Sequence, residues 1–260
     1  MDDLIRPVLD RVLAIDPGEI IGAYLYGSST TTGLGPESDV DLLFVTRRSL
    51  TPEERISLVS TLLGFSGWTG HAEAFPDVAN RRPLEVTSLV ADDLEPLVAA
   101  PCRDFQFGEW LRKDLARGSV PAPERDPDVV ILLATALASH RVLRGPSLES
   151  LVSDVPFELL KNAQLAALPA LVANLGGDHR NVLLTLARAL HTVETGAIVP
   201  KDQAAVTASK RVDADGAELL QAAAREYRGE EQVDWDSKSS RALTLAQSLI
   251  SMIRRTSSEP

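Results

Sequence analysis

The sequence predicts an α+β fold with two domains: a mixed sheet flanked by helices over residues 1–156 and an all-α helical bundle over residues 157–260. Three observations support this prediction. Apolar runs typical of strands alternate with helical spacing in the first part of the chain. Only helical spacing follows the Gly- and Pro-containing stretch 145–156. The 260 residues suffice for two domains, each with its own core.

The first elements alternate between helix and strand. Apolar residues at helical spacing predict a helix over 3–16, and Gly18 ends it. The apolar run 20–26 predicts a buried strand, and residues 39–46 predict a second one. Between them, residues 30–36 form a connection rich in turn-forming residues.

A capped helix and two further strands follow. Thr51 and Pro52, with a glutamate behind them, form a helix start that combines an N-cap, a proline in the first turn and a capping box. Residues 70–75 and 83–90 are predicted to be short strands. A helix over 129–140, with its apolar residues on one face, closes the first domain.

The second domain is predicted to contain helices and no strand. Their apolar residues recur at helical spacing, which is typical of a bundle that buries one face of each helix. We expect these helices at residues 157–173, 179–195, 202–211, 215–227 and 238–255.

The charge and composition limit the classes of partner. The formal net charge of −11 argues against binding to a nucleic-acid backbone, which needs clusters of Lys and Arg, and favours a cationic ligand. The N-terminus lacks the pattern of a signal peptide, and no apolar run approaches the length of a membrane span. We therefore expect a cytoplasmic protein without a membrane or nucleic-acid partner.

Two aspartates one residue apart, Asp39 and Asp41, begin the second predicted strand. Residues at i and i+2 of a strand point to the same face, so the two carboxylates repel each other unless a cation lies between them. Mg²⁺ prefers a couple of carboxylates together with substrate phosphates. Gly27 and Ser28 precede this pair, and glycine allows a phosphate to approach the backbone while a serine hydroxyl can donate to it. The stretch predicts metal-assisted chemistry on a nucleotide.

A third carboxylate is expected from an adjacent strand, and Glu85 is the best candidate. It lies between Leu84 and Val86 in the predicted strand 83–90, where a charged residue would face a cleft or a metal. The alternative is that Glu85 points outward from a half-exposed strand. Spacing alone leaves both possibilities open.

Longer motifs around these residues resemble a known family. The segment Leu25-Tyr26-Gly27-Ser28, followed by Ser38-Asp39-Val40-Asp41-Leu42, resembles the signature of the DNA-polymerase-β-like nucleotidyltransferases. Four further motifs, in the same order along the chain, resemble the aminoglycoside nucleotidyltransferases that adenylylate streptomycin and spectinomycin. These are Phe107-Gly108-Glu109-Trp110, the stretch from Gly177-Asp178 to Leu186, Pro200-Lys201-Asp202, and Arg225-Glu226-Tyr227 with Ala223.

The resemblance implies an enzyme that transfers AMP from ATP to a hydroxyl of an aminoglycoside or aminocyclitol antibiotic. The reaction would depend on Mg²⁺, with two ions expected, would release pyrophosphate, and would give resistance to spectinomycin, streptomycin or both. Asp39, Asp41 and Glu85 match the metal-binding carboxylates of the family, and Glu85 also matches its catalytic base. The first domain would be the nucleotidyltransferase domain, and the family suggests a monomer.

The resemblance also implies two sets of binding residues. Residues matching the ATP contacts of the family are Ser28, Ser38, Asp128, Arg188, Lys201 and Tyr227. Trp110 and Asp178 match contacts to the antibiotic. Dual-specificity members have a Trp and an Asp in the loop before the Gly-Asp motif, where this chain has Pro169 and Asn174. The missing carboxylate at Asn174 favours spectinomycin over the strongly cationic streptomycin, whereas the presence of Trp110 favours streptomycin.

Several of these residues also have a purely structural explanation. Trp110 could be a core aromatic, Tyr227 a domain anchor and Lys201 a helix-end cation, while the four histidines lack metal-ligand spacing and are expected to be structural. Residues 226–231 are expected to be a solvated helix end.

Two other functions are compatible with these residues. One is a nucleotidyltransferase of the same superfamily with a different acceptor, such as a protein side chain or a nucleic-acid end. The other is a non-catalytic nucleotide-binding or antitoxin-like partner protein, which would not need the three intact carboxylates.

Overall fold

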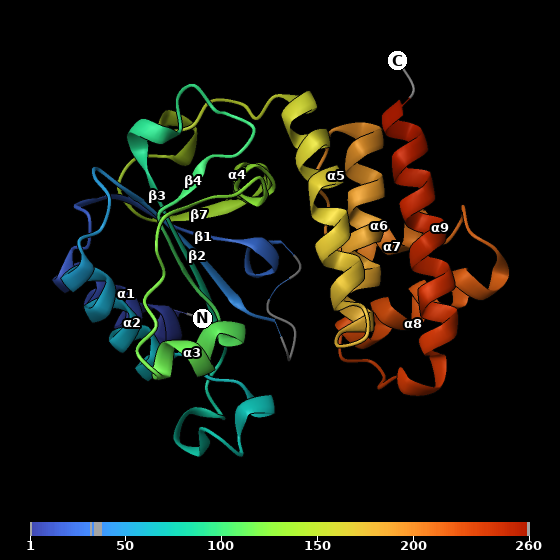
Figure 1. Ribbon diagram of the computed structural model, residues 1–260, viewed down its shortest axis with the longest axis horizontal. Coiled ribbons are helices and arrows are strands. Elements are labelled where there is room, and N and C mark those ends of the chain that lie inside the picture. Colours follow the sequence, from blue (N-terminus) through green and yellow to red (C-terminus); the bar gives the residue numbers. More distant parts are fainter. Residues whose placement is uncertain (1, 32, 34–37, 259–260) are drawn as a thin grey trace. The chain divides into compact units, whose positions relative to one another are not determined.

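The computed structural model describes residues 2–31, 33 and 38–258, and its α+β architecture confirms the predicted fold class (Figure 1). The chain divides into two compact units. The sheet unit comprises the residues up to Val129 together with Ser139–Asp154, and the helical unit comprises Val130–Ala138 and the residues from Val155 onward. A helix expected in the first domain therefore belongs structurally to the second.

The sheet unit contains a mixed five-stranded sheet in the order β5-β3-β2-β1-β7. Strands β2 and β3 are parallel, and the other neighbouring pairs are antiparallel. Three of the four predicted strands are present, with ends that differ by no more than one residue. The five strands are β1 (Ile20–Tyr26), β2 (Val40–Thr46), β3 (Leu84–Val90), β5 (Phe105–Phe107) and β7 (His140–Arg144).

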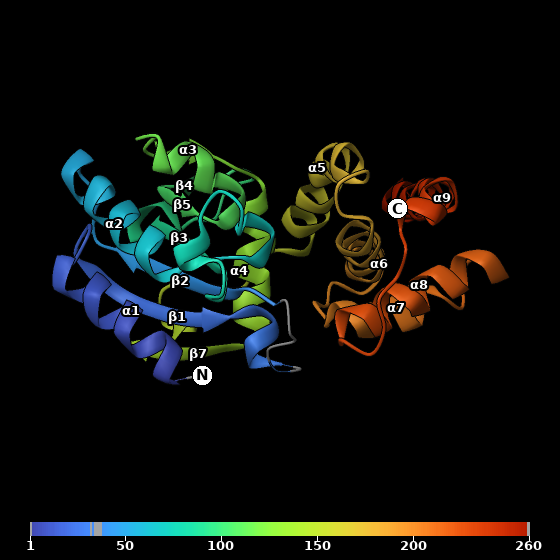
Figure 2. The same ribbon diagram turned by 90° about the horizontal axis from the view of Figure 1, so that it is seen from below.

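Helices α1 (Asp2–Ile15), α2 (Pro52–Phe65) and α3 (Arg112–Ala116) pack on one face of this sheet (Figures 1 and 2). The predicted capping box of α2 is present: the Thr51 hydroxyl accepts from the Glu54 amide at 3.2 Å, and the Glu54 carboxylate accepts from the Thr51 amide at 2.8 Å. Salt bridging by Arg48 lowers the pKa of Glu54 to about 2, so this cap stays ionised at neutral pH.

The observed secondary structure differs from the sequence prediction in several segments. Residues 70–75 are not a strand, because the chain makes two short 3₁₀ turns, Thr69–His71 and Pro76–Val78. The helix expected to end at His140 is α4 (Asp128–Ala138), and His140 instead begins β7, which pairs with β1. The sequence did not predict β5, β7 or the small sheet of β4 (Cys102–Arg103) and β6 (Glu124–Arg125), since the longest of these strands, β7, has 5 residues.

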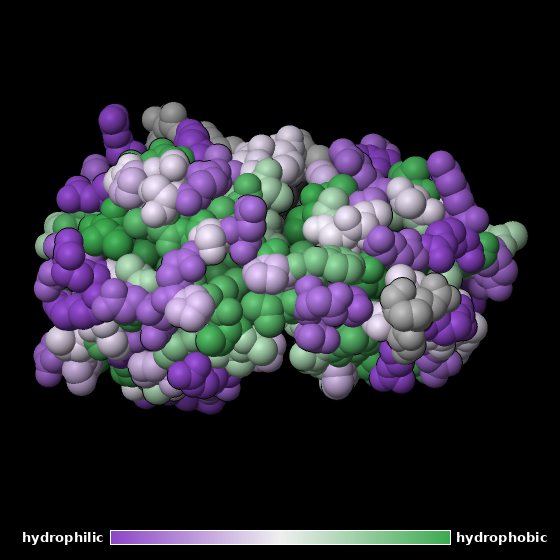
Figure 3. Space-filling model, turned by 90° about the horizontal axis from the view of Figure 1, so that it is seen from above, coloured by the Kyte–Doolittle hydropathy of each residue, from purple (hydrophilic) through white to green (hydrophobic). Residues whose placement is uncertain are grey.

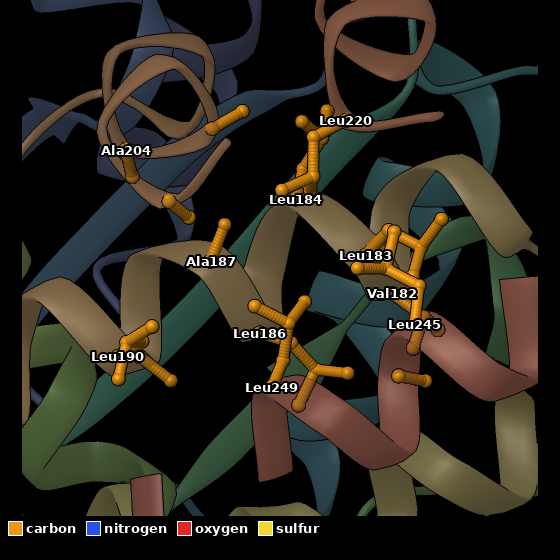
Figure 4. Close-up of a cluster of buried hydrophobic side chains, with 14 of the residues drawn as sticks. Val182, Leu183, Leu184, Leu186, Ala187, Leu190, Ala204, Leu220, Leu245 and Leu249 are labelled. Atoms are coloured by element: carbon orange, nitrogen blue, oxygen red, sulfur yellow. The ribbon is translucent and has the colours of Figure 1, made fainter. Parts of the chain in front are cut away.

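The helical unit confirms the predicted series of helices. Helix α6 packs against α5, α7, α8 and α9, and leucines from several of these helices meet in its core (Figure 4). Val130 and Ile131 of α4 pack on Leu160 and Ala163 of α5, which explains why α4 belongs to this unit. The helices are α5 (Phe157–Asn174), α6 (His179–Thr195), α7 (Lys201–Ala208), α8 (Ala214–Tyr227) and α9 (Ser239–Ser258).

The described helices include none that combines the length and the apolar character needed to cross a bilayer. On the face shown in Figure 3, hydrophilic residues are spread over the surface of both units. This distribution is consistent with the charged content of 24%.

Candidate active site

The two predicted carboxylates of the strands lie side by side. Asp41 is the second residue of β2 and Glu85 is the second residue of β3, and the parallel register pairs them directly. In-register partners on neighbouring strands share a face of the sheet. Asp39 precedes β2 by one residue, and all three carboxylates are half-buried. The fold therefore brings residues far apart in the sequence to one end of the sheet.

Tyr26 is a site residue that sequence reasoning did not single out, although it lies in the Leu-Tyr-Gly-Ser motif. It is the last residue of β1 and pairs with Asp41 on one side and His140 on the other. Burial raises the pKa of its phenol well above the usual value, and the negative charges of Glu85 and Asp41 raise it further. Tyr26 is therefore a neutral hydroxyl beside the acidic residues.

Gly27 follows Tyr26 and makes room for Asp41. Its φ of +74° favours glycine, and a Cβ at this position would lie 2.1 Å from Oδ2 of Asp41. The chain then enters a 3₁₀ turn, Gly27–Thr30, in which the Ser28 carbonyl accepts from the Thr31 and Gly33 amides. The turn thus places Ser28 one residue from the point where the backbone touches the Asp41 carboxylate.

Two arginines accompany the acidic residues. Arg82 donates to the Ser38 carbonyl at 2.8 Å, which connects the segment before β3 to the segment before β2. Arg103 is buried in β4, where it donates to the Thr87 hydroxyl at 3.0 Å and lies 3.4 Å from the Asp128 carboxylate. Its charge also opposes the rise in the pKa of Tyr26. Sequence reasoning missed both arginines, since neither belongs to a matched motif.

The donor set suits a hard divalent cation. Asp39, Asp41 and Glu85 offer carboxylate oxygens, and the absence of a Cβ at Gly27 leaves the space that Asp41 occupies. Across residues 2–31, 33 and 38–258, no three His, Cys, Asp or Glu side chains are gathered closely enough to hold a metal ion alone. Mg²⁺ usually takes one or two carboxylates and completes its shell with water and substrate phosphates, so it does not need such a group.

Trp110 is exposed and is not a core aromatic. It lies in the 3₁₀ turn Glu109–Leu111, which follows β5 in the chain, and 55% of its surface is accessible. Its ring lies against Gly108, where a Cβ would come within 2.2 Å of the ring carbons. Glycine at position 108 therefore permits this ring orientation, and one aromatic face is available to a ligand.

In the helical unit, Asn174 and Asp178 flank a tight helix–helix connection. Asn174 ends α5, and its carbonyl accepts from the Gly177 and Asp178 amides. Asp178 is the N-cap of α6 and accepts from the Asn181 amide at 3.1 Å. Residues 169–174, which match a loop of dual-specificity members, continue α5, in agreement with the predicted helix 157–173. Asn174 and Asp178 are both exposed.

Lys201 contacts α6, and Arg188 lies on the same face of α6 as the residue that Lys201 contacts. The Lys201 ammonium donates to the side-chain oxygen of Asn181 at 2.5 Å, and Arg188 follows Asn181 by two helical turns. Lys201 is the first residue of α7, where the helix dipole disfavours a cation, so stabilisation of the helix end does not explain it. Tyr227 ends α8 and packs, half-buried, against the core of the helical unit.

His179 is structural, as the sequence predicted. It is buried and stacks in parallel on Trp235, with ring centroids 5.9 Å apart. The Trp235 indole donates to Glu226 at 2.7 Å, and Glu226 also accepts from the Val233 amide. The expectation that residues 226–231 form a solvated helix end is therefore wrong for Glu226, which closes the following loop onto α8.

Comparison with known proteins agrees with this arrangement. Residues 150–252 match the family model described as the C-terminal domain of aminoglycoside adenylyltransferase. A spectinomycin 9-adenylyltransferase from Campylobacter jejuni is 36% identical, over 94% of this chain and 92% of that protein. One from Staphylococcus aureus is 38% identical, over 87% and 85%. An aminoglycoside (3'') (9) adenylyltransferase from Escherichia coli is 36% identical, over 82% and 80%.

A solved structure shares the whole fold. The crystal structure of a spectinomycin adenyltransferase from Enterococcus faecalis with ATP and spectinomycin has a TM-score of 0.89 and 28% sequence identity. The similarity covers 97% of this chain and 98% of that one. Together with the curated relatives, it shows that the chain belongs to the aminoglycoside adenylyltransferase family.

Proposed function

We propose that this protein transfers AMP from ATP to a hydroxyl of spectinomycin, and that this modification of the antibiotic confers resistance to it. The observation that carries the proposal is the in-register pairing of Asp41 with Glu85 beside the Gly27-Ser28 turn. The acceptor oxygen attacks the α-phosphorus of ATP, the bond to pyrophosphate breaks, and the hydroxyl proton passes to Glu85. The names of the relatives and the ligands of the solved neighbour support this choice of substrates.

Asp39, Asp41 and Glu85 would hold Mg²⁺, with two ions expected. Bound there, Mg²⁺ would neutralise the charge that develops on the attacking and leaving oxygens. Tyr26 stays protonated beside these carboxylates, so it adds no further negative charge to the site. We assign Asp128, at the start of α4, to nucleotide binding. Arg103 restrains its carboxylate.

The remaining ATP contacts are proposed from the resemblance of the motifs, and the charge and shape of the side chains support them. Ser28 and Ser38 would donate to phosphate oxygens, because Ser38 immediately precedes Asp39 and Ser28 follows Gly27, which lies against the Asp41 carboxylate. In the helical unit, Arg188 and Lys201 would neutralise the triphosphate and Tyr227 would stack on the adenine.

We assign binding of the acceptor to Trp110, Asp178 and Asn174. Trp110 offers an exposed flat face to a sugar or a cation, and Asp178 offers a carboxylate to an ammonium group. Asn174 can bind only through neutral hydrogen bonds, which favours spectinomycin over streptomycin as the preferred substrate. In functional terms, residues 1–156 would be the nucleotidyltransferase domain and residues 157–260 the C-terminal helical domain, with α4 packing in the latter. We expect a cytoplasmic monomer.

The proposal is tested by measuring pyrophosphate release from ATP and Mg²⁺ with a panel of aminoglycosides. Release that requires spectinomycin is the expected result, with streptomycin weaker. Release only with a protein or nucleic-acid acceptor would identify another nucleotidyltransferase. A rise in melting temperature with a non-hydrolysable ATP analogue, without release for any acceptor, would indicate a non-catalytic nucleotide-binding protein.

Truncation of Trp110 should separate the two antibiotics. Trp110→Ala is expected to raise the KM for streptomycin by about tenfold and to change the KM for spectinomycin less, because an aromatic face attracts the more strongly cationic substrate. Steady-state kinetics with both drugs measures this. Ile56→Ala, which removes another exposed apolar side chain of the sheet unit, is the control. Equal losses for both drugs would contradict the assignment.

A further inference from the structure

A buried charged cluster lies outside the residues assigned so far. We call Ser66, His71, Glu109 and Arg112 the Glu109 cluster. Glu109 accepts from the Ser66 hydroxyl at 2.5 Å and from Arg112 at 2.7 and 2.9 Å, and Nδ1 of His71 lies 3.1 Å away. Only 6% of Glu109 and 3% of Arg112 are exposed. Arg112 and the hydrogen bonds from Ser66 and His71 lower the pKa of Glu109 although burial opposes this, so the carboxylate is ionised at neutral pH.

The cluster joins the strand of Glu85 to the turn of Trp110. The Ser66 hydroxyl accepts from the amide of Leu84, which immediately precedes Glu85. Glu109 immediately precedes Trp110. Val86, the residue after Glu85, pairs with Phe107 at the end of β5, two residues before Glu109. Glu109 and its hydroxyl partner thus connect the assigned base and the assigned acceptor contact through two side chains.

The aromatic neighbours of the cluster include a second exposed tryptophan. The His71 ring meets Trp68 edge-on at 5.0 Å and Phe75 at 6.1 Å, and Arg112 lies over the Phe75 ring at 5.4 Å. Trp68 is 45% exposed. Its ring lies against Gly70, where a Cβ would come within 2.4 Å. Trp68 therefore contacts the Glu109 cluster through His71, while Trp110 follows Glu109 directly in the chain.

The sheet unit contains a similar ion pair that serves as a comparison. Asp104 binds Arg55 at 2.7 Å and the Ser49 hydroxyl at 2.5 Å, and it is equally buried. It precedes β5, whereas Glu109 follows β5, and its amide donates to Ser88, three residues along β3 from Glu85. The two pairs share their chemistry but only the Glu109 cluster lies at the end of the sheet where the site residues are.

We propose that Glu109 is a positioning residue that fixes the exposed Trp110 ring relative to Glu85 and so sets how the acceptor is held for reaction. This inference rests on the proposed function. A buried ion pair stabilises a fold poorly compared with apolar packing, but it restricts the geometry of the groups around it. Here the restricted groups are the strand start at Leu84 and the turn at Trp110. The affinity for the acceptor should depend on this geometry, while the affinity for ATP should not.

The test compares Glu109→Gln with Asp104→Asn, which removes the charge of the other buried ion pair. Both variants should lower the melting temperature. Glu109→Gln is expected to raise the KM for spectinomycin about tenfold, with the KM for ATP changed less than about twofold. Asp104→Asn should leave both KM values near those of the wild type. An equal rise in the acceptor KM for both variants, or none for Glu109→Gln, would overturn the proposal.

A milder variant and a direct probe of the Trp110 ring keep the test informative if Glu109→Gln misfolds or is inactive. Ser66→Ala leaves the Glu109–Arg112 pair intact but removes the connection to Leu84, so it should raise the same KM by a smaller factor. Trp110 is the only tryptophan left when the other two, Trp68 and Trp235, are replaced by phenylalanine. In that background, Glu109→Gln should increase acrylamide quenching of Trp110 fluorescence, and Asp104→Asn should not.

These readouts separate the two proposals. A wild-type protein that releases no pyrophosphate with any aminoglycoside would refute the proposed function, whereas the fluorescence comparison would still report whether Glu109 holds the Trp110 ring. Unchanged quenching in Glu109→Gln would refute the positioning role even in an active enzyme.

Discussion

Replacement of Glu85 by glutamine is expected to lower the rate of AMP transfer on the order of 10³-fold while ATP binding stays detectable. Glutamine has the same size and the same place in β3, but it cannot accept the proton of the acceptor hydroxyl. It also removes one negative charge from the pair with Asp41, so the like-charge repulsion between the two side chains at this end of the sheet is lost. Turnover measured by pyrophosphate release, and ATP affinity measured by calorimetry, are the two readouts.

The control for this variant is Glu124→Gln, which neutralises an exposed carboxylate of the same unit in β6. It should leave turnover within about twofold of the wild type, since solvent screens an exposed charge and leaves it with little effect. Near-normal turnover in Glu85→Gln would show that another group accepts the proton. A total loss of ATP binding would show instead that Glu85 serves the nucleotide rather than the acceptor.

Replacement of Gly27 by alanine should have the second large effect. The Cβ would lie 2.1 Å from Oδ2 of Asp41, so the carboxylate must leave its position or the turn must open. Displacement of a reacting group by about 1 Å commonly costs roughly 10²-fold in rate, and we expect a loss of this order in kcat/KM. The positive φ adds a further destabilisation of about 1–2 kcal/mol.

Gly118→Ala separates these two contributions. Gly118 has a φ of +93° but no atom within 4 Å of the added Cβ, so the variant carries only the backbone strain. It should be destabilised to a similar degree and should retain its activity. If Gly27→Ala lost stability without losing more activity than Gly118→Ala, contact between residue 27 and Asp41 would not matter for the reaction.

The site strands could be predicted from the sequence because each is long and buried. Strands β1, β2 and β3 have seven residues each, and Asp41 and Glu85 are conspicuous as charged residues within apolar runs. Strand β7 could not be predicted. It lies at the edge of the sheet, is mostly polar, and owes its conformation to pairing with residues of β1 that are distant in sequence.

The buried polar groups could be predicted from the sequence even less well than β7. Glu109 and Arg112 have a helical i,i+3 spacing that usually marks an exposed pair, and nothing local indicates that Ser66 and His71 join them. Tyr26 resembles any other apolar residue of a strand until the sheet register places it beside Asp41. Segment 70–75 alternates like a strand, but the His71 amide bonds the Trp68 carbonyl within a turn.

The membership of α4 in the helical unit has a consequence for how such proteins can be recombined. The chain passes between the two units three times, near residues 129, 138 and 154, because α4 leaves the sheet unit and β7 returns to it. A chimaera joined once at residue 156 would bring α5 from one parent to α4 from the other, with Leu160 and Ala163 facing foreign partners. Exchange of specificity between relatives should therefore succeed more often when α4 is inherited together with α5.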